Sequence, residues 1–163
     1  FGDTFVIPQA TIPRAGARVM DLQEPTDKMS KSAASDAGVV YLMDDLSVTA
    51  KKFKRAVTDS GGEVRYDPEG KPGVSNLLSI LGAATGRPAE ELGEQYSQYG
   101  PLKADTADAV VELLTPIQER FRELADDPAG TSELLAIGAE KARAVAGGVY
   151  ARAVEHIGLL PRA

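Results

Sequence analysis

Residues 107–124 read ADAVVELLTPIQERFREL and form the longest periodic stretch of the chain. Apolar side chains recur there every three or four residues, a spacing that places them on one face of an α-helix. They are Ala107, Val110, Leu114, Ile117, Phe121 and Leu124. Pro116 lies inside the pattern, and because proline lacks a backbone N–H we expect a kink rather than a straight helix. The stretch predicts that helices dominate the fold.

Helical patterns also lie on both sides of this stretch. Upstream, Asp44 and Asp45 precede an apolar face where carboxylates can cap a helix and oppose its dipole. The helices predicted upstream run from Leu46 to Val57, from Val74 up to Gly86 and from Ala89 to about Gln98, followed by a break at Gly100 and Pro101. Downstream, a last helix carries a stripe whose small residues would let another helix approach closely. The stripe consists of Leu135, Gly138, Ala142, Val145, Val149, Ala153 and Ile157.

The first 37 residues differ in character from the rest. They are rich in proline, glycine and arginine and show no sustained helical period. Two short apolar runs, 5–7 and 18–20, are bounded by turn-forming residues and predict pieces of β-strand. The fold class predicted from the sequence is therefore mainly α: an irregular segment, residues 1–37, followed by a helical bundle of four to six helices, residues 38–163.

Composition narrows the classes of function. The chain has 163 residues, enough for about one domain with a core, and 18 basic against 24 acidic side chains give a net charge of −6. This balance argues against extended, nonspecific nucleic-acid binding, although a local basic patch remains compatible with it. Cysteine is absent, which excludes disulfides and zinc–thiolate sites. With no apolar run of transmembrane length and no signal-peptide pattern, we expect a soluble, cytoplasmic protein without membrane partners.

Residues 28–32 read KMSKS and carry the clearest chemistry. Lys28 and Lys31 supply compact positive charge on flexible stems. Ser30 and Ser32 can donate hydrogen bonds to phosphate oxygens, and Met29 is an adaptable apolar side chain that can lie against a flat base. The combination predicts a loop that grips and releases the phosphates of ATP. A basic, solvated surface loop is the alternative.

The blocks around this loop carry a resemblance to a known family. They are Gly16–Leu22, Glu24–Asp27, Arg55–Ser60, Val64–Asp67, Gly73–Leu78, Gln118–Phe121 and Gly138–Ala142. In this order and spacing they resemble the C-terminal half of bacterial tryptophanyl-tRNA synthetases, which are class I aminoacyl-tRNA synthetases. Tyrosyl-tRNA synthetases are the second choice. Because the chain begins at Phe1 without an initiator methionine, we expect it to be a fragment of a longer protein.

The resemblance implies both an organisation and a function. Residues 1–37 would be the end of a Rossmann-like catalytic domain, and residues 38–163 the helical anticodon-binding domain. The whole enzyme, expected to be a homodimer, would activate tryptophan with ATP and Mg²⁺ and transfer it to the tRNA for tryptophan. The tryptophan pocket would lie in the other half, so we expect the fragment alone to be inactive. No tightly bound cofactor is expected.

Roles for single residues follow from the same resemblance. Lys31 is the candidate for stabilising the transition state, and Lys28 for holding ATP. Val19 would touch the adenine with Met29 close by, although Val19 could equally be a buried strand residue. Ser30 and Ser32 complete the predicted ATP-binding set.

A basic helix face is the candidate contact for the tRNA backbone. It consists of Lys51, Lys52, Lys54 and Arg55, whereas acidic side chains outnumber basic ones from residue 73 onward. A solvated helix face is the competing interpretation. Two further functional alternatives are a stand-alone module that binds the anticodon arm and an unrelated helical scaffold. The single histidine, His156, is expected to oppose a helix dipole, and no metal site is predicted.

Overall fold

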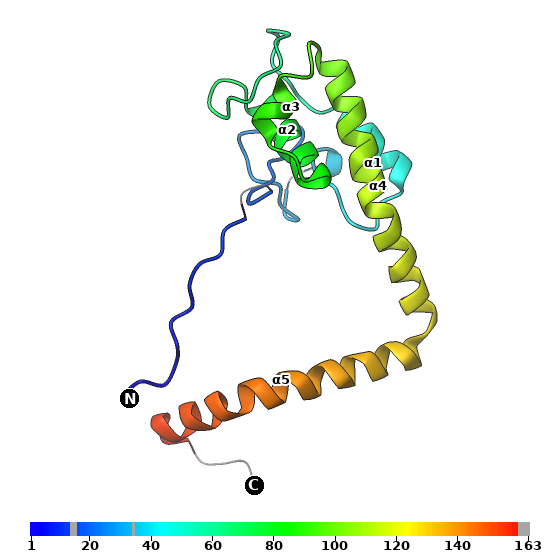
Figure 1. Ribbon diagram of the computed structural model, residues 1–163. Helices are drawn as coiled ribbons and strands as arrows, with labels where there is room; N and C mark the ends of the chain where they lie inside the picture. The colour runs from blue at the N-terminus through cyan, green and yellow to red at the C-terminus, as the bar shows by residue number, and fades with distance from the viewer. Residues whose placement is uncertain (14–15, 34, 160–163) are drawn as a thin grey trace. The chain divides into compact units, whose positions relative to one another are not determined.

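The computed structural model describes residues 1–13, 16–33 and 35–159. Within these residues, one 3₁₀ helix and five α-helices follow one another (Figure 1). They are η1 (Asp36–Gly38), α1 (Leu46–Lys54), α2 (Pro72–Thr85), α3 (Ala89–Gly93), α4 (Tyr99–Asp126) and α5 (Pro128–Ile157). The described residues form no β-strand, only one isolated antiparallel bridge between Met20 and Lys28. The prediction of a mainly helical fold after an irregular N-terminal segment is confirmed.

The chain folds into two compact units. We call residues 12–120 the site unit, and residues 1–11 together with 121–163 the terminal unit. The division into residues 1–37 and 38–163 concerns the domains of a longer protein and stays a prediction.

Helix α2 forms the centre of the site unit. Val74, Leu77 and Leu78 have no exposed surface, because side chains on all of its faces are covered. The short helix α3 packs against α2 (Figure 1). Further core residues come from α1, α3, α4 and the connecting loops, and they are Leu22, Phe53, Ala56, Val64, Leu92, Leu102, Ala107, Val110 and Leu114. A helix that is covered all round needs no charged face, which explains why α2 contains no charged residue.

The helix ends follow from local chemistry. The Asp45 side chain accepts a hydrogen bond from the Ser47 backbone N–H at the start of α1. Pro72 occupies the first turn of α2, where the missing N–H costs nothing. Gly86 ends α2 with a φ of 73°, a left-handed conformation that favours glycine. The helices predicted around these caps are confirmed, although α1 ends at Lys54 instead of continuing to Val57.

Two predicted boundaries between α3 and α4 are wrong. Helix α3 ends at Gly93 rather than near Gln98, because Gly93 lies against the backbone of Tyr66 and glycine is a poor helix former. Helix α4 begins at Tyr99, so the break predicted at Gly100 and Pro101 is its first turn, where a proline is tolerated. Beyond this turn α4 continues through Pro116 to Asp126.

The predicted strand pieces are also wrong. Val6 and Ile7 are 93% and 90% exposed and belong to no strand. Of the second run, only Met20 takes part in a bridge. A strand needs a partner that takes up its backbone hydrogen bonds, and an apolar run alone does not supply one.

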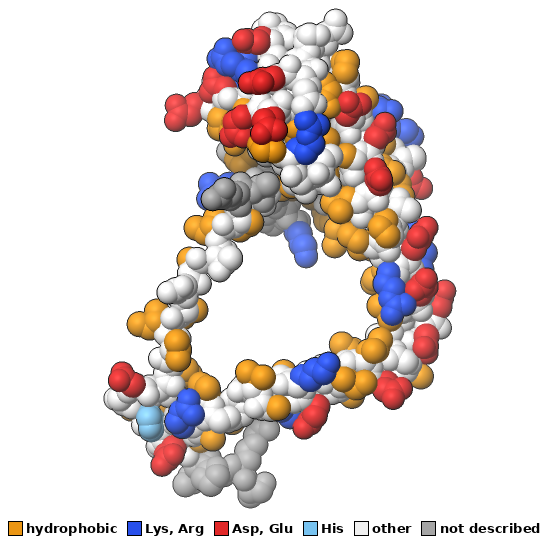
Figure 2. Space-filling model, viewed as in Figure 1, with side chains coloured by type: hydrophobic (Ala, Val, Ile, Leu, Met, Phe, Trp, Pro, Cys, Tyr) orange, Lys and Arg blue, Asp and Glu red, His pale blue; other side chains and the backbone are white. Residues whose placement is uncertain are grey.

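Helix α5 dominates the terminal unit. It begins at Pro128, after Asp127 accepts a hydrogen bond from the Gly130 N–H, and it ends before Gly158 with a φ of 78°. Its predicted stripe is largely exposed: Leu135 is 69% and Val145 82% exposed, whereas Ala153 is buried. Hydrophobic side chains are accordingly visible along α5 in Figure 2. Near the helix end, Thr4 Oγ1 lies 2.6 Å from His156 Nδ1.

Candidate nucleotide site

The lysine loop, residues 28–32, grows out of a small hairpin. The Met29 N–H donates to Val19 O at 3.0 Å, and the Asp21 N–H donates to Asp27 O at 2.9 Å, on either side of the Met20–Lys28 bridge. These bonds fix which residues of the two arms lie opposite each other, and so they fix the position of Lys28 at the start of the lysine loop. The hairpin exists without a neighbouring strand because side chains of the helices hold it, as described below.

The turn of the hairpin is organised by Asp21. Its Oδ1 accepts hydrogen bonds from the backbone N–H groups of Gln23 (2.7 Å) and Glu24 (3.1 Å), an arrangement that replaces a backbone turn. Leu22 N–H donates to Gly38 O at 3.0 Å and ties the turn to η1. Asp21 is 7% exposed, so its carboxylate serves the turn rather than a ligand.

Asn76 of α2 holds the same hairpin from its other side. Its Oδ1 accepts from the Met20 N–H and its Nδ2 donates to Met20 O, each at 2.9 Å. Asn76 is 5% exposed. Sequence reasoning assigned it no role, although a polar residue inside the apolar stretch of α2 is a signal that could have drawn attention to it.

The segment 39–44 is held opposite the lysine loop by two long side chains. Lys52 Nζ donates to Val39 O at 2.6 Å and lies 2.8 Å from Asp44 Oδ2. Gln118 Nε2, from α4, donates to Leu42 O at 2.8 Å and to Asp44 O at 2.9 Å. Gln118 is 2% exposed, so these carbonyl groups are fixed to the body of the site unit.

Hairpin and segment enclose a hollow of about 580 Å³. Five of the six predicted ATP-binding residues line it, namely Val19, Lys28, Met29, Ser30 and Lys31. The opposite wall consists of residues 39–43, which sequence reasoning did not identify. Ser32 lies outside the lining, but its Oγ is 3.0 Å from Ser30 Oγ.

The hollow combines a cationic side with an apolar one. Lys28 and Lys31 are exposed, so their ammonium groups are available to a ligand, while Val19 and Met29 are half-buried against the core. Tyr41 on the opposite wall donates to Asp36 Oδ1 at 2.8 Å, and this hydrogen bond raises the pKa of the Tyr41 phenol. Such a surface can take a flat apolar group on one side and an anionic chain on the other.

The four residues of the predicted basic face differ in their exposure to solvent. Lys51, Lys54 and Arg55 are exposed, whereas the side chain of Lys52 is 14% exposed and bonded within the fold. Its Nζ also lies 5.6 Å from the centre of the Tyr41 ring. Along the visible face of α4, acidic and basic side chains are interspersed (Figure 2). A phosphate contact by this region would thus depend on three side chains of α1.

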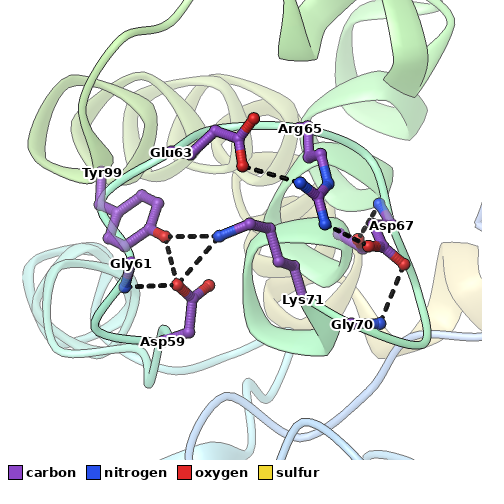
Figure 3. Close-up of polar contacts among 9 residues, drawn as sticks. Asp59, Gly61, Glu63, Arg65, Asp67, Gly70, Lys71 and Tyr99 are labelled. Carbon is purple, nitrogen blue, oxygen red and sulfur yellow. Dashed lines mark hydrogen bonds and ion pairs between the residues drawn. The ribbon is translucent and has the colours of Figure 1, made fainter.

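A second polar cluster connects the segment after α1, the residue before α2 and the first residue of α4 (Figure 3). Asp59 Oδ1 accepts hydrogen bonds from Tyr99 Oη at 2.6 Å, Lys71 Nζ at 3.0 Å and Gly61 N–H at 2.8 Å. These donors, the Tyr99 hydroxyl foremost, lower the pKa of Asp59 to about 2. Lys71 is 8% exposed and its pKa is raised, chiefly by the bond to Asp59. The cluster occupies Lys71, so it offers no free cation to a ligand.

The described residues contain neither a cluster of metal ligands nor a membrane-spanning helix. Across residues 1–13, 16–33 and 35–159, no group of three or more histidine, cysteine, aspartate or glutamate residues is placed to hold a metal ion. None of the helices in the same part of the chain is long and apolar enough to cross a membrane.

Comparisons with known proteins show the family of the chain. The model of the family described as "tRNA synthetases class I (W and Y)" matches residues 1–115. The tryptophan–tRNA ligase of Mycobacterium leprae (strain TN) is 50% identical over 164 residues, covering 99% of this chain and 48% of the relative. Tryptophan–tRNA ligase 1 of Streptomyces coelicolor is 53% identical over 161 residues, with the same coverage of both chains.

Solved structures point the same way. The crystal structure of tryptophanyl-tRNA synthetase from Mycoplasma pneumoniae matches with a TM-score of 0.80 and 33% identity, covering 91% of this chain and 45% of that one. The one from Campylobacter jejuni matches with a TM-score of 0.58 and 27% identity, covering 97% of this chain and 48% of that one.

The family model covers most of the chain, and the chain therefore belongs to the family of class I tRNA synthetases for tryptophan and tyrosine. The relatives named above are tryptophan enzymes, so the resemblance stated from the sequence is confirmed. The chain spans about half the length of the curated relatives it matches.

Proposed function

We propose that this chain is the C-terminal half of a tryptophan–tRNA ligase and contributes the lysine loop to tryptophan activation. The observation that carries the proposal is the hollow in which Val19, Lys28, Met29, Ser30 and Lys31 meet. In the reaction the carboxylate of tryptophan attacks the α-phosphorus of ATP, and pyrophosphate leaves with the bonding electron pair. The products are tryptophanyl-adenylate and pyrophosphate, and a second step transfers the tryptophanyl group to its tRNA with release of AMP.

The residues of the hollow take up different tasks. The adenine would lie against the apolar side at Val19 and Met29, and Lys28 would hold the phosphates of bound ATP. Lys31 would meet the negative charge that develops on the departing pyrophosphate. A cation that meets charge only in the transition state accelerates the reaction, whereas equal binding throughout does not. Ser30 and Ser32 would donate hydrogen bonds to phosphate oxygens.

The hollow also bears on the role of Mg²⁺. Its described lining residues include no carboxylate, the protein group through which Mg²⁺ is usually held. These residues therefore do not fit a resident Mg²⁺ site. The ion would arrive with the ATP phosphates, and no step of the mechanism is derived through it.

The remaining partners follow the same proposal. The exposed residues Lys51, Lys54 and Arg55 would contact the backbone of the tRNA for tryptophan. Lys52 would instead stabilise the fold through its bonds to Val39 and Asp44. Tryptophan itself would bind in the other half of the enzyme, a homodimer in the cytoplasm. A module that only binds the anticodon arm is the second candidate, favoured by the chain's coverage of about half of each relative.

Tryptophan-dependent exchange of pyrophosphate into ATP tests the proposal. The assay compares the chain alone with a protein in which it is joined to the other half of its relatives. We expect exchange only from the longer protein, with tryptophan and not with tyrosine. Exchange by neither protein, combined with tRNA binding by the chain, would favour the binding module. Exchange with tyrosine alone would assign the enzyme to the tyrosine branch.

A further inference from the structure

The backbone of Met20 faces away from the lysine loop. Val19 and Asp21 on either side of it form the hydrogen bonds to the Asp27–Met29 segment, as antiparallel pairing requires. The N–H and C=O of Met20 therefore point to the opposite edge of the hairpin. At this edge an open strand leaves both groups without a backbone partner.

Asn76 takes the position that a third strand would occupy. One side-chain amide satisfies both backbone groups of Met20, with two hydrogen bonds of 2.9 Å. Only one orientation of the amide makes both bonds, since its oxygen must accept and its nitrogen must donate. Asn76 is 5% exposed and stands between Val74 and Leu77, neither of which is exposed at all. The amide is thus anchored on a helix whose neighbouring side chains are fully buried.

From these contacts we propose that Asn76 is a positioning residue for the lysine loop. It fixes the hairpin to α2, and the hairpin in turn fixes the position at which the loop with Lys28 and Lys31 begins. The inference rests on the proposed function of the loop. Met20 is bridged to Lys28, and Lys31 follows three residues later. Asn76 is not among the described residues that line the hollow, and it acts through the backbone of Met20. Misplacing a catalytic group by about 1 Å can cost on the order of a hundredfold in rate.

Ser75, the neighbour of Asn76 on α2, provides a matched control. It is 3% exposed, and its Oγ accepts a hydrogen bond of 2.8 Å from the backbone N–H of Asp67. Replacing either residue removes a buried bond between α2 and a loop. Only Asn76 reaches the hairpin, so a purely structural role would make the two variants alike.

The experiment uses the chain joined to the other half of its relatives, with Asn76→Ala, Asn76→Asp and Ser75→Ala. Hydrogen exchange should accelerate at the Asp21 and Met29 amides in Asn76→Ala and stay unchanged there in Ser75→Ala. In tryptophan-dependent pyrophosphate exchange, kcat should fall roughly ten- to a hundredfold in Asn76→Ala with a smaller change of KM for ATP, and less than threefold in Ser75→Ala. Asn76→Asp keeps the acceptor for the Met20 N–H but turns its second carboxylate oxygen towards Met20 O, so it should also loosen the hairpin. It decides the question if the alanine variant does not fold.

Equal hairpin protection, or equal kinetics, in the Asn76 and Ser75 variants would overturn the inference. A different result would contradict the proposed function: the chain joined to the other half of its relatives, without any substitution, would show no tryptophan-dependent pyrophosphate exchange. The hydrogen-exchange difference at Asp21 and Met29 would still decide whether Asn76 holds the hairpin.

Discussion

Lys71 Nζ lies 3.0 Å from Asp59 Oδ1, and this pair links the segment after α1 to the residue before α2. Tyr99, at the start of α4, donates to the same carboxylate oxygen, so three parts of the site unit meet at one atom. The pair is structural because Asp59 Oδ1 takes up the Lys71 ammonium group inside the site unit (Figure 3).

This cluster predicts how stability depends on acid. The folded pKa of Asp59, about 2, is below its ordinary value of 3.8, so the unfolded chain binds the proton more readily. The stabilisation is complete above about pH 4 and is lost as the pH falls towards 2. Asp59→Asn should lower the free energy of unfolding by about 2 kcal/mol at neutral pH, and the difference should shrink below pH 4. Urea titrations between pH 7 and 2.5 measure this.

Glu63→Gln is the control for that titration. Glu63 is paired with Arg65, but both side chains are more than half exposed. An exposed pair contributes about 0–1 kcal/mol, so this variant should unfold almost as the parent does. An acid dependence of equal size in both variants would contradict the assignment to Asp59.

The close approach of Gly38 to Asp21 predicts that a larger side chain at position 38 lowers stability. A Cβ at position 38 would overlap the Asp21 carboxylate, which organises the turn of the hairpin. Gly38→Ala should therefore cost about 1–3 kcal/mol. Gly138→Ala, where a Cβ meets nothing within 4 Å, should be neutral or stabilising. Adding Asp21→Ala to Gly38→Ala should cost less than the sum of the single changes, and strict additivity in denaturation would argue against the clash.

Two neighbouring lysines of α1 should behave differently. Lys52→Ala removes the bonds to Val39 and Asp44 and should lower the free energy of unfolding by about 2 kcal/mol. Lys51→Ala changes an exposed side chain and should leave stability within about 0.5 kcal/mol of the parent. Thermal or urea unfolding compares the two, and equal stability would show that the Lys52 bonds contribute nothing.

The lysine loop predicts a kinetic effect in the longer protein. Lys31→Ala should reduce the rate of tryptophan activation on the order of a hundred- to a thousandfold, with a much smaller loss of ATP affinity. Pre-steady-state kinetics separate the two quantities. Lys54→Ala, an exposed lysine of α1 outside the hollow, is the control and should leave both unchanged. Equal losses in affinity and rate for Lys31→Ala would indicate uniform binding instead.

The basic face of α1 predicts a salt-dependent effect on tRNA. Reversing Lys51 and Lys54 to Glu should weaken binding of the tRNA for tryptophan, and each lost phosphate contact should reduce the salt slope by somewhat less than one unit. Lys141→Glu with Arg152→Glu on α5 changes the net charge equally, at two exposed positions, and serves as the control. Titrations at several salt concentrations compare the variants. Parallel salt lines for the parent and the α1 variant would identify a solvated face.

The sequence alone determined the mainly helical fold, most helix positions and the residues of the lysine loop. These features depend on local chemistry: the apolar period of α4, the caps at Asp45 and Gly86, and the order of charges and hydroxyls in residues 28–32. The resemblance added the family, and the comparisons confirmed it.

Only the tertiary structure decided which backbone groups are paired and which side chains face inward. The Met20 N–H bonds to the side chain of Asn76, 56 residues away, and the Leu42 carbonyl bonds to the side chain of Gln118, 76 residues away. Lys52 looks like its basic neighbours in the sequence but turns towards Val39 and Asp44. Local periodicity cannot reveal such pairings, because a buried backbone group must find its partner wherever the folded chain brings one within hydrogen-bonding distance.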